Sequence, residues 1–209
     1  MTTVRIAVIY YSATGSTHRL AESISAGAAC AGAEVRLRRV AELAPEDAID
    51  RNLAWRAHID ETKDSVEEAA LADLEWAHGY AFGTPSRFGN VAAQLKQFMD
   101  SAGGLWANGA LANKPVTAFT TAMNPHGGQE STNLALTNSF YHWGGIIVPP
   151  GYTDDRVYAA GGNPYGVSWT SGVDGALPDD VTLAAAHYQG ARLALVTRAL
   201  QGSQFLASA

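Results

Sequence analysis

Residues 4–17 constrain the fold more than any other stretch of this 209-residue chain. Apolar, mostly β-branched residues at positions 4–9 predict one short buried strand, which two tyrosines close. Small and hydroxyl-bearing residues follow at once, and then a helical pattern places Leu20 and Ile24 on one apolar face. This order of buried strand, small loop and helix is typical of the start of an open α/β sheet, whose ligands bind at the carboxyl ends of the strands.

The loop after this strand is suited to phosphate. A helix N-terminus leaves backbone N–H groups unpaired and carries a partial positive charge, and small residues let an anion come close. The candidate phosphate-binding residues are Ser12, Ala13, Thr14, Gly15, Ser16 and Thr17. The same hydroxyls could be ordinary helix caps. With one glycine and no lysine, the loop is neither a dinucleotide fingerprint nor a P-loop, which favours a phosphate monoester held by neutral donors.

Four more strands alternate with helices along the chain. We expect strands at residues 34–39, 80–83, 116–121 and 146–148, and helices within 67–76, 91–99, 133–141 and 181–200. Such alternation predicts an α/β fold with a five-stranded parallel sheet and helices on both faces. Right-handed crossovers leave few topologies, of which the strand order 2-1-3-4-5 brings three loops together.

Two further loops follow strands and carry unusual residues. The loop after the third strand contains Pro85, Ser86, Arg87, Phe88, Gly89 and Asn90. An aromatic and an arginine among small residues suit a flat ligand, although a tight turn that happens to carry Phe88 is the alternative. The loop after the fourth strand contains Thr121, Ala122, Met123, Asn124, Pro125, His126 and Gly127. The sequence therefore predicts one site built from three separated loops.

The remaining segments are less informative. Residues 45–68 are polar and charged, and we interpret them as an excursion with a short helix rather than a second domain. Residues 152–180 show no period, and long loops of this kind are usually functional. Trp106 follows a double glycine, so it is either a plug over the core, which the residues alone favour, or an aromatic wall of a site. His142 is equally compatible with a structural role and a place at the site.

Composition narrows the class of protein. The net charge of −6, with no basic run, argues against nucleic acid as a partner. Cys30 is the single cysteine, which excludes an internal disulfide framework, and its place at the end of the first helix predicts a packing role. No signal peptide opens the chain and no apolar run approaches the ~20 residues of a membrane span, so we expect a cytoplasmic protein.

Taken together, these loops resemble the flavodoxin-like NAD(P)H:quinone oxidoreductases of the WrbA family. The resemblance runs nearly end to end and is carried by residues 10–12, 82–90, 103–107, 126–130 and 163–166. It implies a single flavodoxin-like domain over residues 1–209, a three-layer sandwich that binds FMN. It further implies that NADH or NADPH donates a hydride in a ping-pong exchange and that a quinone is then reduced by two electrons.

The resemblance also implies roles for residues. Residues 12–17 would hold the FMN phosphate, residues 85–90 would line the isoalloxazine, and residues 121–127 would cover its other flank. His142 matches a histidine beside the flavin, and Arg87 could stabilise negative charge on the reduced flavin or on the quinone. Trp106 matches an aromatic that closes the substrate pocket from a neighbouring subunit, which favours a homotetramer, with a dimer as the alternative.

Several points stay open at this stage. Thr14 stands where family members often have an aromatic that helps to bind nicotinamide, so the choice between NADH and NADPH is open. No catalytic residue is assigned beyond the flavin. One rival class is a flavodoxin-type electron carrier that passes single electrons to protein partners, against which residues 152–180 and Trp106 argue. A third is a non-catalytic, oligomeric scaffold or stress protein.

Overall fold

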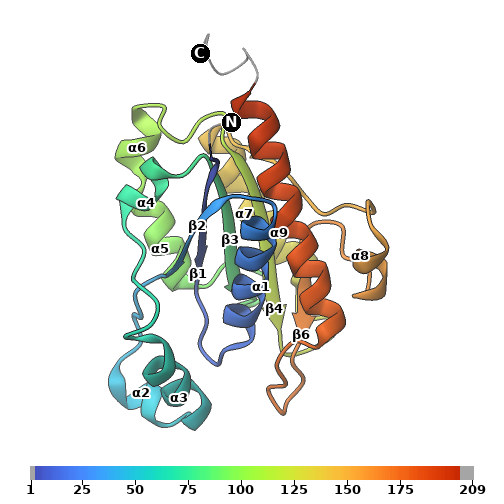
Figure 1. The fold of residues 1–209 in the computed structure, drawn as a ribbon. Helices are drawn as coiled ribbons and strands as arrows, with labels where there is room; N and C mark the ends of the chain where they lie inside the picture. The colour runs from blue at the N-terminus through green and yellow to red at the C-terminus, as the bar shows by residue number, and fades with distance from the viewer. Residues whose placement is uncertain (1–2, 203–209) are drawn as a thin grey trace.

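The computed structural model describes residues 3–202, shown in Figure 1. The strands are β1 (Arg5–Tyr10), β2 (Glu34–Arg39), β3 (Gly79–Pro85), β4 (Pro115–Ala122), β5 (Ile146–Ile147) and β6 (Ser168–Thr170). The helices are α1 (Ser16–Cys30), α2 (Glu46–Asp50), α3 (Leu53–Thr62), α4 (Leu71–Trp76), α5 (Ala93–Ser101), α6 (Gly103–Ala107), α7 (Gln129–Trp143), α8 (Asp155–Ala159) and α9 (Asp180–Gln201).

The sheet has the predicted topology. Its strands are parallel and run in the order β2-β1-β3-β4-β5, so the expected flavodoxin-like arrangement is confirmed. A sixth strand was not predicted. Strand β5 pairs with only the first two residues of β4, and β6 pairs with residues 120–122 at the other end of β4. Together β5 and β6 cover one edge of β4, and β6 brings the end of a distant segment to the carboxyl end of the sheet.

Helices cover both faces of the sheet and bury an apolar core on each (Figure 1). On one face, α1 and α9 pack over the side chains of Ile6 and Val8. These two helices touch through glycine, since a Cβ at Gly27 would lie 1.9 Å from the carbonyl oxygen of His187 on α9. On the other face, α5 and α7 cover Phe82. The apolar positions of the predicted helices thus explain both layers.

Residues 45–68 and 152–180 are more ordered than the sequence suggests. The first segment contains two helices, α2 and α3, instead of a single short one. The second contains α8 and β6, so its interpretation as a segment without periodic structure was wrong. The helices α2 and α8 and the strand β6 are too short for their residues to show a period in the sequence. The helix expected within 67–76 begins only at Leu71, because Glu68 bridges to Arg39 beside β2.

Two single-residue predictions were also wrong. Cys30 is exposed at the last residue of α1, because the helix turns its buried face, including Gly27 and Ala28, away from it. Trp106 is 55% exposed and lies on the short helix α6, so it is not the plug over the core that the residues alone favoured. Within residues 3–202, no helix is both long and apolar enough to cross a membrane.

Candidate functional site

The three predicted loops meet at the carboxyl end of the sheet. The loop of residues 11–15 leads from β1 into α1, residues 86–92 follow β3, and residues 123–128 follow β4. Because β1, β3 and β4 are neighbours in a parallel sheet, their carboxyl ends lie side by side. The strand order alone therefore brings residues separated by more than 100 positions to one place.

Hydrogen bonds between hydroxyl groups fix the loops to one another. Oγ1 of Thr17, in the first turn of α1, lies 2.8 Å from Oγ1 of Thr121 at the end of β4. Ser86 joins the other two loops: its N–H donates to the Thr121 carbonyl at 2.7 Å, and its Oγ donates to the Gly127 carbonyl at 2.6 Å. All these groups are buried or half-buried. The loops therefore form one connected site.

Glycine allows two of the loops to touch. Gly128 has a φ of 86° and Gly89 a φ of 74°, values in the left-handed region that side chains disfavour. A Cβ added at Gly128 would lie 2.6 Å from the Cα of Gly89. The second and third loops thus approach as closely as backbone allows, and any side chain there would separate them.

A cleft of about 270 Å³ lies over the first loop. Its walls come from all three loops, from the excursion and from the segment after β6. The lining residues are Ser12, Ala13, Thr14, Ser16, Thr17, Asn52, Trp55, Pro85, Ser86, Arg87, Thr121, Ala122, Met123 and Ser171. The floor of the cleft consists mainly of hydroxyl-bearing residues. The first turn of α1 lies there, and its backbone N–H groups have no carbonyl partner inside the helix. This floor is called the cradle below.

A second hollow continues from the first and shares Ser86, Ala122 and Met123 with it. It is lined by Ser86, Phe88, Gly89, Ala122, Met123, Asn124, His126, Gly127 and Gly128. Phe88 is fully exposed and has a φ of 54°, which is strained for an aromatic residue. Met123 is 57% exposed beside it. The two hollows form one groove, with hydroxyls at the cradle and with glycine backbone, Phe88 and Met123 among polar residues at the other end.

Not every predicted residue lines this groove. Gly15 shapes the cradle loop from within, with a φ of 99°. Asn90 exchanges two backbone hydrogen bonds with Arg87 and closes the turn of the second loop. Pro125 faces a different cleft, between the third loop and the segment after α8.

Trp106 and His142 lie away from the groove of their own chain. Helix α6 follows α5 and lies at the end of the sheet opposite the carboxyl ends of the strands (Figure 1). The seven residues of β3 alone span about 20 Å between these two ends. His142 is in the last turn of α7, about 20 Å along the helix from its start at the groove. The two residues are neighbours, because Nε1 of Trp106 donates to the His142 carbonyl at 2.8 Å.

The sequence did not indicate the contribution of the excursion. Asn52 and Trp55, at the start of α3, line the cradle side of the groove. Nε1 of Trp55 donates at 3.0 Å to Glu42, whose carboxylate also accepts from Tyr11 and Gln94. A tryptophan among charged residues was the only signal. Ser171, which follows β6, had none, because its place depends on a strand that the sequence did not predict.

Glu42 is therefore an ionised anchor for the excursion. Burial alone would raise the pKa of its carboxyl, but the hydrogen bonds from the Ala44 N–H, Gln94 and Tyr11 outweigh burial and lower that pKa. Burial, together with the neighbouring carboxylate, raises the pKa of Tyr11. The excursion is thus held beside the groove by a carboxylate that is charged at neutral pH.

The groove fits FMN. The unpaired N–H groups and the hydroxyls of the cradle suit a phosphate monoester, and no lysine is needed. Because glycines form the contact between the second and third loops, a flat ring in the second hollow would lie against loop backbone and the side chains of Phe88 and Met123. Arg87 is exposed at the boundary of the two hollows.

Comparison with known proteins agrees with this geometry. A family model described as NADPH-dependent FMN reductase matches residues 4–156. The chain belongs to this family. A relative from Deinococcus radiodurans, named NAD(P)H dehydrogenase (quinone), is 46% identical over 177 residues, which are 85% of this chain and 88% of the relative. Relatives of the same name from Geotalea uraniireducens and Methanosarcina acetivorans are each 37% identical over nearly their full length.

Solved structures with lower sequence identity to this member of the FMN reductase family show the same fold. A flavodoxin, WrbA-like protein from Agrobacterium tumefaciens aligns with a TM-score of 0.65 and 23% identity, over 94% of this chain and 99% of that one. A flavodoxin from the domain Archaea aligns with a TM-score of 0.63 and 16% identity, over 93% and 99% of the two chains. The predicted WrbA-type, flavodoxin-like assignment is therefore confirmed at the level of family and fold.

Proposed function

We propose that this protein is an FMN-dependent NAD(P)H:quinone oxidoreductase. The observation that carries the proposal is the groove, in which three loops join an anion cradle to a second hollow lined by glycine backbone, Phe88 and Met123. A family of FMN reductases and full-length relatives named NAD(P)H dehydrogenase (quinone) support it. The flavodoxin-type carrier is disfavoured, because the likeness to a flavodoxin is limited to fold, at 16% identity.

The cradle would hold the phosphate of FMN. The loop of Ser12 to Thr17 offers hydroxyl and backbone donors, and the positive end of α1 favours the anion. The ring would occupy the second hollow, where Phe88 and Met123 offer apolar surface and the Gly89–Gly128 contact keeps the walls close. When bound, FMN supplies the two-electron chemistry that links NAD(P)H to a quinone.

The protein's own contribution is positioning and electrostatics. Arg87 is exposed at the edge of the groove, where its charge favours anionic groups on the flavin, NAD(P)H or a reduced quinone. Asn52 and Trp55 narrow the groove beside the cradle. The open face of the groove leaves room for a nicotinamide and a quinone to bind in turn, as a ping-pong scheme requires.

The site is shared between subunits in this proposal. Trp106 and His142 are exposed together at the end of the sheet opposite the groove, so they cannot serve the groove of their own chain. Tyr141, 68% exposed, extends the same surface. In a homotetramer, or a dimer, this surface would close the groove of a neighbouring copy with an aromatic lid.

Steady-state kinetics test the proposal. The purified protein, saturated with FMN, is assayed with NADH or NADPH and benzoquinone at several fixed concentrations of each. We expect parallel lines in double-reciprocal plots and one hydroquinone formed for each NAD(P)H consumed. Intersecting lines would exclude a ping-pong exchange, and the absence of turnover with every quinone and both coenzymes would exclude the activity.

A further inference from the structure

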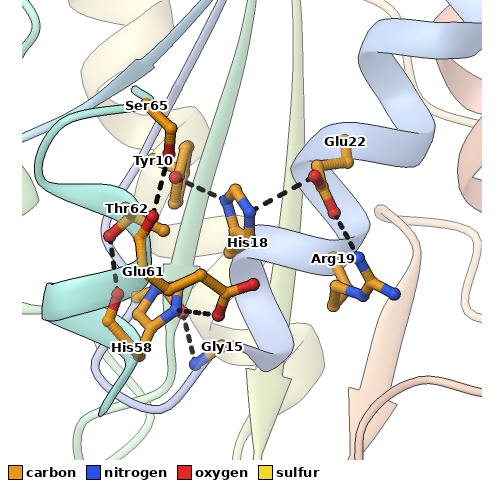
Figure 2. Close-up of polar contacts among 10 residues, drawn as sticks. Tyr10, Gly15, His18, Arg19, Glu22, His58, Glu61, Thr62 and Ser65 are labelled. Carbon is orange, nitrogen blue, oxygen red and sulfur yellow. Dashed lines mark hydrogen bonds and ion pairs between the residues drawn. The ribbon is translucent and has the colours of Figure 1, made fainter. Parts of the chain in front are cut away.

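Two buried histidines lie directly beneath the cradle. His18 is in the first turn of α1 and His58 is on α3, and each is 6% exposed. Their ring centroids are 5.2 Å apart. Figure 2 shows His18 between Tyr10, whose hydroxyl lies 2.6 Å from its Nδ1, and Glu22, whose carboxylate lies 3.4 Å from its Nε2. His58 lies beside Glu61 in the same view. Two ionisable rings in contact inside a protein need a reason beyond packing.

The pair lies next to the cradle loop in both space and sequence. A Cβ added at Gly15 would lie 3.6 Å from Nδ1 of His58, so this ring faces the loop across a gap that a single carbon atom would fill. His18 follows Thr17 directly in the sequence. A small cavity of about 50 Å³ lies beside the His58 ring and is lined by His58, Tyr10 and Ser12 of the cradle loop. The cradle loop thus connects the pair to a group bound at the cradle, because Gly15 faces His58 and Thr17 precedes His18.

The two arginines near the pair are already paired with carboxylates. The titratable and charged side chains that face it are Tyr10 from β1, Arg19 and Glu22 from α1, Arg39 from β2, Glu42 from the following loop and Glu61 from α3. Arg19 is 2.9 Å from Glu22, and Arg39 is 2.9 Å from Glu68. The loop of residues 12–17 contains no lysine or arginine. Arg87 also lines the groove, as an exposed guanidinium, so the two histidines are the buried groups beside the cradle whose charge can change when an anion binds.

In the protein without ligand the pair is neutral at pH 7. Burial lowers the pKa of His18. Burial, and then the neighbouring His18, lower the pKa of His58 to about 4. Glu22 and Glu61 act in the opposite direction on both rings but do not outweigh burial. A phosphate dianion at the cradle would change this balance, because an opposite charge within about 4–6 Å raises the pKa of a histidine by roughly 1–3 units.

We propose that the His18–His58 pair supplies the counter-charge of the cradle: when a phosphate monoester dianion binds there, the pair takes up one proton. The inference rests on the proposed function, since FMN is the phosphate monoester in question. Linkage makes the effect reciprocal: if bound phosphate raises the proton affinity of the pair, then lowering the pH must strengthen the binding of the phosphate. The phosphate of FMN is then recognised by a charge that exists only when the phosphate is present.

The direct test measures the histidines themselves. The ring pKa values of His18 and His58 are followed by NMR in the free protein, in the riboflavin complex and in the FMN complex. Riboflavin lacks only the phosphate, so it controls for the effect of the flavin ring. We expect at least one of the two pKa values to rise by about one unit or more with FMN, relative to both other states. Equal values in all three states would overturn the proposal.

Variants separate this role from a merely structural one. His58→Gln keeps a polar side chain of similar length, and His187→Gln removes a half-buried histidine on α9 that lies against α1 about 15 Å from the cradle. FMN dissociation constants are measured by flavin fluorescence quenching from pH 8 to pH 6. The ratio of wild-type to variant affinity cancels the ionisation of the FMN phosphate, which both proteins share.

For the double variant His18→Gln/His58→Gln, this ratio should rise about threefold or more as the pH falls to 6, because only the wild type can take up the linked proton; His58→Gln alone measures the share that His58 carries. For His187→Gln it should stay flat. A flat ratio for the double variant, with FMN still bound, would overturn the coupling and leave the proposed function intact. Failure of the wild type to bind FMN at any pH would instead refute the proposed function, and the coupling with it.

Discussion

Replacement of Thr17 by valine tests the placement of the phosphate. Valine keeps the shape of the side chain but removes a buried hydroxyl that lies 2.8 Å from Oγ1 of Thr121. In the variant, the hydroxyl of Thr121, a residue that is 5% exposed, loses this hydrogen-bond partner. The loss of a partner by a buried polar group lowers the free energy of unfolding by about 1–3 kcal/mol. For a chain of this length, each kcal/mol lowers the melting temperature by about 2–4 °C. A modest loss of stability is therefore expected without FMN.

The effect on FMN should be larger than the effect on riboflavin. A hydrogen bond to a charged phosphate contributes about 1.5–3 kcal/mol, which corresponds to a roughly 10- to 150-fold weaker affinity for FMN. Riboflavin has no phosphate, so its affinity should change by less than about threefold. Thr17→Ser keeps the hydroxyl and is the matched control. Both affinities are measured by titration with flavin fluorescence quenching. An equal loss of affinity for FMN and for riboflavin would show that the phosphate binds elsewhere.

Three further predictions follow from the same geometry. Gly128→Ala should weaken FMN binding at least tenfold, because its Cβ would meet Gly89, whereas Gly109→Ala has the same positive φ and open space and should not. The free energy of unfolding should fall as the pH is lowered from 6.5 to about 4, because in this range the unfolded chain protonates His58 and the folded protein does not. The loss should reach at most about 1.4 kcal/mol per pH unit for this one group, and His58→Gln should flatten the slope in urea titrations. Trp106→Ala should raise the quinone KM with little change in FMN affinity; an unchanged KM, or a fully active monomer by light scattering, would exclude the shared site.

The sequence was most informative where residue type follows strand position. The β-branched run before Tyr10 and the small loop after it predicted β1, the cradle and the start of α1. The convergence of three loops then followed from strand order alone, because parallel neighbours end at one edge. Neither conclusion required knowledge of side-chain contacts.

The rest depended on contacts between segments that have no period of their own. Strand β6 is three residues long and pairs with β4 through an alignment that residues 152–180 do not reveal. The place of Trp55 is set by its bond to Glu42, a partner on a different element. His58 was hidden in the same way, since a buried histidine on a charged helix is recognisable only when the cradle above it is known.

The central claim, that the groove is an FMN site which serves NAD(P)H and quinone, is tested most directly under anaerobic conditions. The protein is saturated with FMN and freed of excess flavin, and the visible absorbance of the flavin is recorded on addition of one equivalent of NADH or NADPH and then of benzoquinone. We predict that the absorbance is retained on the protein, is lost with the coenzyme and returns in full with the quinone, with one hydroquinone formed. Protein that retains no flavin, or retained flavin that neither coenzyme bleaches, would contradict the account.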